Sequence, residues 1–145
     1  MSKSKGNVID PLVLIEKYSA DALRFTLLSM ASPGRDVKLS EDRVKGYRNF
    51  LNKVWNANNL LLQNECNFDA IENPKDLKVN INKWIVSEYY SINHTIKQNI
   101  KDYRFDEAAK NAYQFVWHSF CDWYLELSKT IFYSDDKSSI EEVKK

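Results

Sequence analysis

Glycine, proline and cysteine are scarce in this chain of 145 residues, which contains three, three and two of them. All three prolines, Pro11, Pro33 and Pro74, fall between segments of periodic hydrophobic spacing, so the scarcity of helix breakers favours helices. Cys66 and Cys121 are far apart and form no CxxC pair, which predicts free thiols in a reducing compartment. A small disulfide-stapled scaffold is therefore not expected.

Long apolar runs and a strong net charge are also lacking. No run reaches the roughly 18 residues of a membrane span, and Asp10 and Pro11 interrupt the segment 8–15, which excludes a signal-peptide core there. Because the net charge is only +1, any contact with nucleic acid must come from a local patch. The 43% hydrophobic content predicts one globular domain, which we expect to be cytoplasmic and monomeric.

Hydrophobic residues recur at helical spacing, and no useful strand alternation appears. Asp10 followed by Pro11 predicts a helix to about Tyr18, and Ser19 and Ser40 are predicted caps of the next two helices. Further helices are predicted over about 81–101 and from about 105 to 134. Residues 135–145 are charged, have no evident cap and are expected to fray. The predicted fold is an all-α antiparallel helix bundle.

The three long helices each carry a predicted core stripe. The first stripe consists of Val44, Tyr47, Leu51, Val54, Asn58 and Leu61. The second consists of Ile85, Tyr89, Ile92, Ile96 and Ile100. The third consists of Ala108, Ala109, Ala112, Phe115, Val116, Phe120, Trp123, Leu127 and Ile131, and nearby aromatics widen it, which places this helix centrally. The four tryptophans are interpreted as core residues, and Trp55 alone is considered for stacking on a base.

Cations and amides gather around the first long helix. The cations are Arg35, Lys38, Arg43, Lys45, Arg48 and Lys53, and the amides are Asn49, Asn52, Asn56 and Asn59. Cations suit phosphates and amides suit base edges, so the pattern indicates contact with an RNA loop. Two other interpretations stay open, namely a solvated basic face and a surface that packs against another domain. His94 and His118 are interpreted as packed or surface residues, and Glu107, Asp122 and Glu126 as a solvated face.

The first seven residues, Met-Ser-Lys-Ser-Lys-Gly-Asn, combine two amines, two hydroxyls and a glycine in one short segment. Such a loop can close over a triphosphate, where a lysine stabilises the charge that develops as pyrophosphate leaves. A flexible start that happens to be rich in serine and lysine is the alternative. The segments that follow distinguish the two.

The segment 1–7 resembles the Lys-Met-Ser-Lys-Ser (KMSKS) loop of class I aminoacyl-tRNA synthetases, without its leading lysine. Ala-Asp-Ala-Leu-Arg-Phe at 20–25 is similar to the helix that follows this loop in the family. The segments 32–37, 46–57 and 120–126 resemble the valine-specific branch. The resemblance covers about residues 1 to 130 in order. It lacks the nucleotide-binding domain with its His-Ile-Gly-His motif, the editing domain and the coiled-coil tail, so we interpret the chain as a fragment.

This resemblance implies specific roles. Lys3 is the expected catalytic residue of ATP-dependent valine activation, and Ser2, Lys3 and Ser4 are expected to contact ATP, which carries Mg²⁺ in the full enzyme. The expected contacts to tRNA(Val) are Arg35, Arg43, Arg48, Asn49, Asn52, Lys53 and Asn56. No metal ligands are expected. The implied division is 1–36 for the loop and connecting helices, 37–134 for a helical anticodon-binding domain, and 135–145 for a flexible tail.

Alone, the chain is expected to be inactive, because its partners include the missing catalytic and editing domains. Two other functions remain possible from the sequence. One is an RNA-binding or scaffolding module that merely retains the loop. The other is the same kind of enzyme acting on isoleucine, leucine or methionine, against which the segments at 34–36 and 55–56 argue by resemblance only.

Overall fold

The computed structural model describes residues 9–34, 36–66 and 74–145, and every regular element in these ranges is helical. Two short helices, α1 (Pro11–Tyr18) and α2 (Ala20–Ser29), precede the long helix α3 (Glu41–Gln63). The short 3₁₀ helix η2 (Pro74–Asp76) leads into α4 (Asn80–Lys101). The remaining elements are α5 (Phe105–Gln114), the π-helical segment η3 (Phe115–Tyr124), α6 (Leu125–Phe132) and α7 (Lys137–Val143). The all-α prediction is confirmed.

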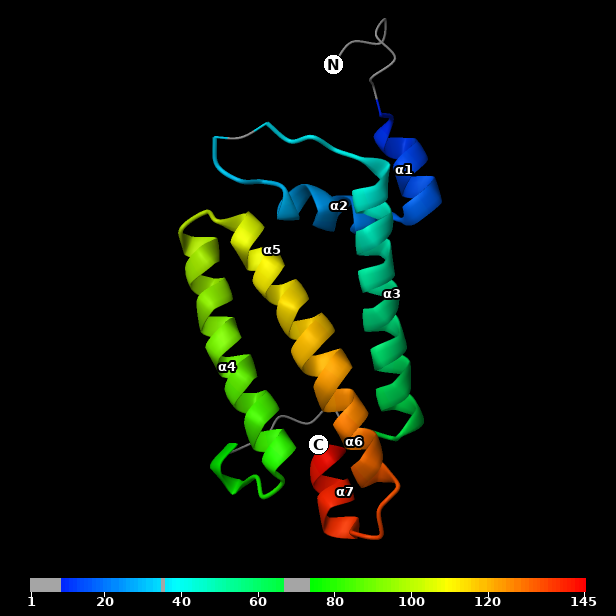
Figure 1. The fold of residues 1–145 in the computed structure, drawn as a ribbon, viewed down its shortest axis with the longest axis vertical. Coiled ribbons are helices and arrows are strands. Elements are labelled where there is room, and N and C mark those ends of the chain that lie inside the picture. The colour runs from blue at the N-terminus through cyan, green and yellow to red at the C-terminus, as the bar shows by residue number, and fades with distance from the viewer. Residues whose placement is uncertain (1–8, 35, 67–73) are drawn as a thin grey trace, which may run out of the picture.

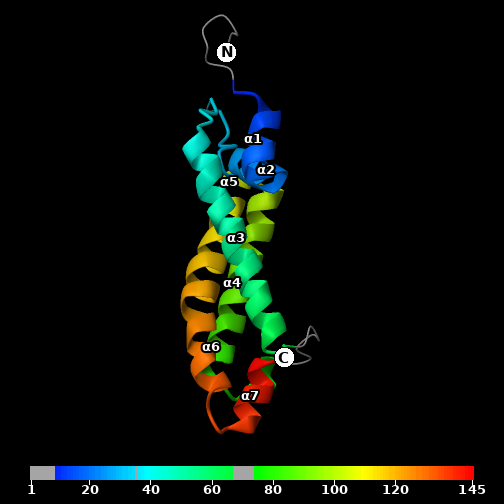
Figure 2. The same ribbon diagram turned by 90° about the vertical axis from the view of Figure 1, so that its right-hand side faces the viewer.

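The long helices form an elongated bundle in which consecutive helices alternate in direction (Figure 1). The run from α5 through η3 to α6 lies between α3 and α4, so its predicted central position is confirmed. The short helices α1 and α2 lie at one end of the bundle, and α7 lies at the other, as Figure 2 shows from the side. Because α4 packs mainly against the central run, it forms one edge of the bundle.

Local capping explains where the first helices begin. Asp10 Oδ1 accepts a hydrogen bond from Leu12 N at 2.9 Å, and Ser19 Oγ accepts one from Ala22 N at 3.3 Å, which confirms both predicted caps. Ser19 alone joins the first two helices, and its φ of 92° shows how sharply the chain turns there. Ser40 occupies the cap position of α3, but its side chain makes no capping hydrogen bond.

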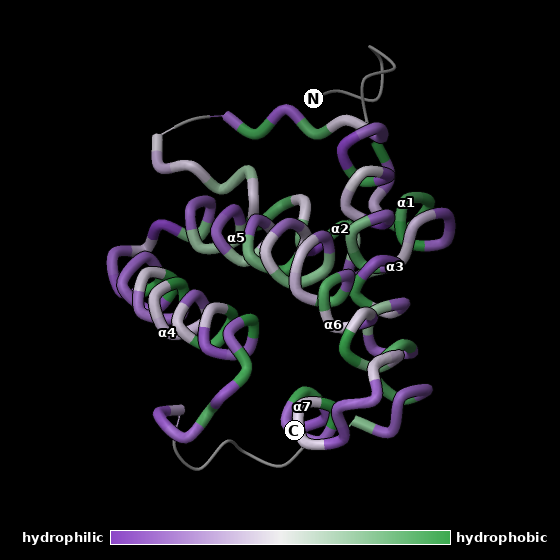
Figure 3. Tube along the Cα trace, turned by 60° about the horizontal axis from the view of Figure 1, so that its bottom comes forward, coloured by the Kyte–Doolittle hydropathy of each residue, from purple (hydrophilic) through white to green (hydrophobic). Residues whose placement is uncertain are grey.

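Two apolar clusters and an aromatic band form the interior. The cluster nearest α1 contains Leu14, Tyr18, Ala22, Leu23 and Val44. The cluster at the far end contains Ala57, Cys121 and Leu125. Between them lie the rings of Phe25, Tyr47, Phe50, Tyr113 and Trp117, with successive centroids 4.8–6.3 Å apart. Hydrophobic and hydrophilic residues alternate along the helices, so the apolar surface lies on one side of each helix (Figure 3).

The predicted stripes of α3 and α4 are partly wrong. On α3, Phe50 and Ala57 are buried beside Val44, whereas Val54 is exposed. On α4, Ile85 is buried as predicted, but Tyr89 is exposed because this helix packs against the bundle on one side only.

The predicted core position of Trp123 is also wrong, because its side chain is 62% exposed. Cys121, Leu125 and Ser128 are buried in its place. The cause is the π-helical backbone of η3, whose wider turns shift every later side chain away from the 3.6-residue period that the prediction used. Trp55 and Trp84 are exposed too, so the interpretation of the tryptophans as core residues holds only for Trp117, which is half-buried.

The prediction that the chain frays after Ser134 is wrong. Asp136 caps α7 by accepting hydrogen bonds from the backbone N–H groups of Ser138 and Ser139 at 3.1 and 3.3 Å. Val143, at the end of α7, is buried. The charged composition of 135–145 did not predict α7, because this helix is stabilised by its cap and by contacts with distant segments. The division into a segment 1–36 and a domain 37–134 stays a prediction.

Candidate nucleic-acid interface

The outer side of α3 carries most of the predicted RNA contacts. We call Arg48, Asn49, Asn52, Lys53 and Asn56 the α3 polar face. Arg48 and the three asparagines are exposed, and Lys53 is half-buried against η3. Arg43 is exposed on the same helix but faces α5. Spacing of three and four residues places Asn49, Asn52 and Asn56 along one line of the helix. The structure therefore brings six of the seven predicted RNA contacts onto one helix.

The lower half of this face borders a groove of about 440 Å³. Lys53, Asn56, Asn59 and Gln63 of α3 line one wall, and Glu126 and Lys129 of α6 line the other. Cys121 and Leu125 lie between the walls, and burial raises the pKa of the Cys121 thiol, which keeps it protonated. The groove thus has one wall rich in amides, an opposite wall formed by the Glu126–Lys129 ion pair, and an apolar floor, an arrangement that can hold an unstacked base.

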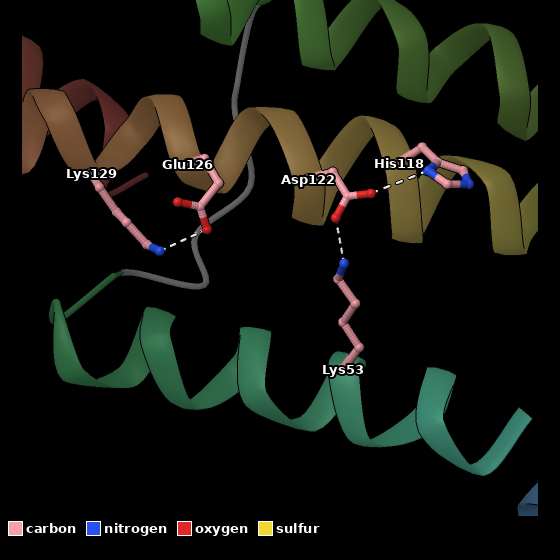
Figure 4. A network of polar contacts seen from close by, with 5 residues as sticks. All are labelled: Lys53, His118, Asp122, Glu126 and Lys129. Atoms are coloured by element: carbon pink, nitrogen blue, oxygen red, sulfur yellow. Dashed lines mark hydrogen bonds and ion pairs between the residues drawn. The ribbon is translucent and has the colours of Figure 1, made fainter. Parts of the chain in front are cut away.

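Lys53 differs from Arg48, the other cation of the face. Its ammonium forms an ion pair with Asp122 of η3, and it lies 4.4 Å from the centre of the Trp117 ring. The second oxygen of Asp122 is 3.1 Å from His118 Nδ1, so both carboxylate oxygens have partners (Figure 4). The hydrogen bond from Lys53 lowers the pKa of Asp122, which therefore stays ionised at neutral pH.

Arg43 and Arg48 have no ion pair within the part of the chain that the structure describes. Arg43 lines a second cleft of about 540 Å³, together with Tyr47, Lys110 and Tyr113. The carboxylates that border this cleft are already paired, since Arg104 contacts both Asp106 and Glu107. The guanidinium of Arg43 is therefore available to an external anion.

Asp106 holds the end of α2 against α5 beside this cleft. It accepts hydrogen bonds from Ser32 Oγ at 2.6 Å and from Arg104 Nε at 3.1 Å. These bonds, that from Arg104 above all, hold the pKa of Asp106 well below its usual range. The contact joins two segments 74 residues apart in the sequence. It fixes the end of the bundle at which α1 and α2 lie.

Several predicted site residues lie outside the described residues, namely Ser2, Lys3, Ser4 and Arg35. Sequence reasoning missed Gln63 and Lys129 as groove residues, although Gln63 continues the three-and-four spacing of Asn56 and Asn59. It interpreted Asp122 as part of a solvated face, whereas this carboxylate joins η3 to α3. The spacing of four residues between His118 and Asp122 was the available signal for this network.

Trp55 is 66% exposed and follows directly after Lys53 and Val54 on α3. Within the described ranges, no group of three or more histidine, cysteine, aspartate or glutamate side chains could hold a metal ion. None of the helices described is both long and apolar enough to cross a membrane.

Comparisons with known proteins identify the families that this chain resembles. Residues 1–40 match the family model of class I tRNA synthetases for isoleucine, leucine, methionine and valine. Residues 82–145 match the model of the anticodon-binding domain of tRNA ligases. Valine–tRNA ligase from Pelagibacter ubique is 72% identical over 99% of this chain, and those from Zymomonas mobilis and Brucella suis are 52% and 51% identical over 94% and 96% of it. The chain belongs to the valine–tRNA ligase family.

The matched part is a small share of these valine–tRNA ligases, because the chain spans only 15–16% of their length. Within this family, α3 falls between the two segments that the family models match, whereas the relatives cover it. The resemblance to class I synthetases, and to their valine-specific branch, is thereby confirmed.

Proposed function

We propose that this chain forms part of a valine–tRNA ligase and that its α3 polar face and groove bind the anticodon arm of tRNA(Val). The observation that carries the proposal is the line of exposed amides on α3, which leads into the groove. Two exposed arginines on the same helix have no ion pair in the described ranges. Family membership supplies the context, since one of the matched models is an anticodon-binding domain.

The exposed residues of α3 offer two kinds of contact to RNA. Arg43 and Arg48 are free to neutralise phosphates, which gives affinity without sequence information. Asn49, Asn52 and Asn56 offer both donors and acceptors, which can pair with the edges of unstacked bases. Exposed Trp55 offers a ring on which a base can stack. Arg35, in the same role as the other arginines, completes the proposed set.

The N-terminal loop serves the chemical step in this proposal. The resemblance assigns Lys3 to the stabilisation of charge on the pyrophosphate as valine is activated with ATP and Mg²⁺, and Ser2 and Ser4 to contacts with the nucleotide. These residues lie outside the described part of the structure, so their assignment rests on the family resemblance. We expect no aminoacylation from these 145 residues alone, because they cover a small share of the relatives.

Anticodon discrimination tests the proposal. The probes are an anticodon stem-loop of valine sequence and the same loop with its central base changed. The dissociation constants of the two loops should differ for the wild-type chain, and Asn52→Ala or Asn56→Ala should reduce their ratio, because amides read base edges. Asn93→Ala, on α4, is the matched control and should keep the ratio.

Two outcomes would count against this function. If the wild-type chain binds neither loop, the anticodon arm is not its ligand. If it binds both loops and the two asparagine variants keep the wild-type ratio, the amides of α3 are structural and another surface reads the anticodon.

A further inference from the structure

Helix α3 carries cations of two kinds. Arg43 and Arg48 are exposed, and neither has an ion pair in the described ranges. The side chain of Lys53 is only 29% exposed, is paired with Asp122 and covers the Trp117 ring. A phosphate that approached Lys53 would have to displace a carboxylate that is already in place.

The carboxylate is itself held in position. One oxygen of Asp122 contacts Lys53 of α3, and the other lies 3.1 Å from His118 Nδ1, one turn earlier on η3 (Figure 4). Both contacts favour the ionised form of Asp122. Because η3 packs against α3, the Asp122 carboxylate lies beside the Lys53 ammonium.

This arrangement changes what the groove can recognise. The charges of Lys53 and Asp122 cancel, so the wall next to the apolar floor offers the amides of Asn56, Asn59 and Gln63 and little net charge. Phosphate contacts bind every RNA sequence alike, whereas amide contacts to bases distinguish sequences. A free lysine at this position would therefore add affinity for all RNA loops equally.

We propose that Asp122 prevents Lys53 from acting as a phosphate contact and so limits the sequence-independent part of RNA binding beside the groove. The inference rests on the proposed RNA-binding function and deepens it. Asp122 acts through Lys53 and need not touch the RNA. The role is distinct from a purely structural ion pair, because it changes the salt dependence of RNA binding.

The test measures binding of the two anticodon stem-loops to the chain between about 50 and 200 mM salt. Asp122→Asn should tighten binding to both loops and steepen the dependence of log affinity on log salt by about 0.7–0.9, which corresponds to one added phosphate contact. The ratio between the two loops should stay at its wild-type value, because a phosphate contact strengthens the binding of both loops equally. Glu141→Gln makes the same change in net charge at an exposed site on α7 and should leave slope and ratio unchanged.

Removing the lysine provides the second measurement. Lys53→Gln alone should keep the wild-type salt slope, and adding it to Asp122→Asn should return the slope of that variant to the wild-type value. An unchanged slope in a folded Asp122→Asn chain overturns the inference. So does a slope that is shallower by one phosphate contact in Lys53→Gln, and this readout remains should Asp122→Asn fail to fold. If the wild-type chain binds neither loop, the proposed function itself is overturned. This outcome distinguishes a failure of the proposed function from a failure of the inference about Asp122.

Discussion

Glu142 of α7 and Asn82 of α4 are joined by a hydrogen bond of 3.0 Å, although 60 residues separate them in the sequence. The Glu142 carboxylate also accepts hydrogen bonds from the backbone N–H groups of Lys78 and Val79, each at 2.8 Å. Asn82 in turn accepts a hydrogen bond from the Tyr124 hydroxyl at 3.0 Å. The C-terminal helix thus caps the start of α4 and connects it to the central helix run.

Glu142→Ala should lower the free energy of unfolding by about 1–2 kcal/mol, because it removes a helix cap and leaves Asn82 without one partner. Glu141→Ala is the control, since Glu141 is exposed on the same helix. Urea unfolding followed by circular dichroism measures both. Equal stability of the two variants would mean that α7 contributes no cap to α4.

The contribution of Glu142 should depend on pH. Burial acts to raise its pKa, but the hydrogen bonds from Lys78, Val79 and Asn82 outweigh burial and hold the pKa below its ordinary value. A carboxylate with a lowered folded pKa stabilises fully above its unfolded pKa of about 4.3, and the stabilisation is lost as pH falls through the folded pKa. The stability gap between wild type and Glu142→Gln should therefore be constant near neutrality and shrink in acid. A gap of the same size at about pH 7 and pH 3 would show that the charge is not its source.

Leu125→Ala and Trp123→Ala, two residues apart, should lower the free energy of unfolding by very different amounts. Leu125 is 4% exposed in the far apolar cluster, so its truncation should cost about 2–5 kcal/mol. Trp123 is largely exposed, and its truncation should cost less than about 1 kcal/mol. Thermal and urea unfolding of both variants checks which residues of the run from α5 to α6 face the core. A larger loss from Trp123→Ala would contradict the π-helical register.

Replacing Arg43 and Arg48 together by glutamate should weaken binding to every RNA loop tested and flatten its salt dependence. Both guanidinium groups are exposed on α3 and lack an ion pair in the ranges described, so each can neutralise one phosphate. The paired control replaces Lys97 and Lys101 of α4 by glutamate, which makes the same change in net charge. Titration of the two stem-loops at several salt concentrations compares them. Equal weakening by both double variants would indicate an effect of overall charge.

Lys3→Ala tests the enzymatic part of the proposal within a longer valine–tRNA ligase that includes this sequence. Valine-dependent exchange between ATP and pyrophosphate should slow by about 100-fold or more, with little change in valine binding, because the charge acts mainly in the transition state. Lys5→Ala is the neighbouring control. Near-normal exchange by Lys3→Ala would remove this lysine from the mechanism and favour the alternative of an RNA-binding module.

Local patterns were enough to predict much of the fold. Asp10 and Ser19 were predictable as caps, because a cap needs only the side chain and the next few backbone N–H groups. The line of amides on α3 was visible from its spacing, because helical periodicity fixes which residues share a face. The family was evident from segments 1–7 and 20–25 and from those downstream, and the comparisons confirm it.

Other features depended on contacts between distant segments and could not be derived from spacing. The ion pair between Lys53 and Asp122 forms only because η3 packs against α3. The sequence pattern therefore did not predict that the two residues are partners. The exposure of Trp123 follows from a π-helical segment whose hydrogen bonds the 3.6-residue period does not anticipate.

The sequence by itself determined most of the helices and of their starts, the family and the residue types available for RNA contact, since each is encoded within a few neighbouring residues. The tertiary structure alone decided which of those residues are free to act. It leaves Arg43 and Arg48 without an ion pair in the described ranges, neutralises Lys53 and orders the C-terminal helix through Glu142. The physical reason is that residues far apart in the chain come together in the bundle. Their contacts then decide which charges are compensated, which side chains are buried and which helix ends are capped.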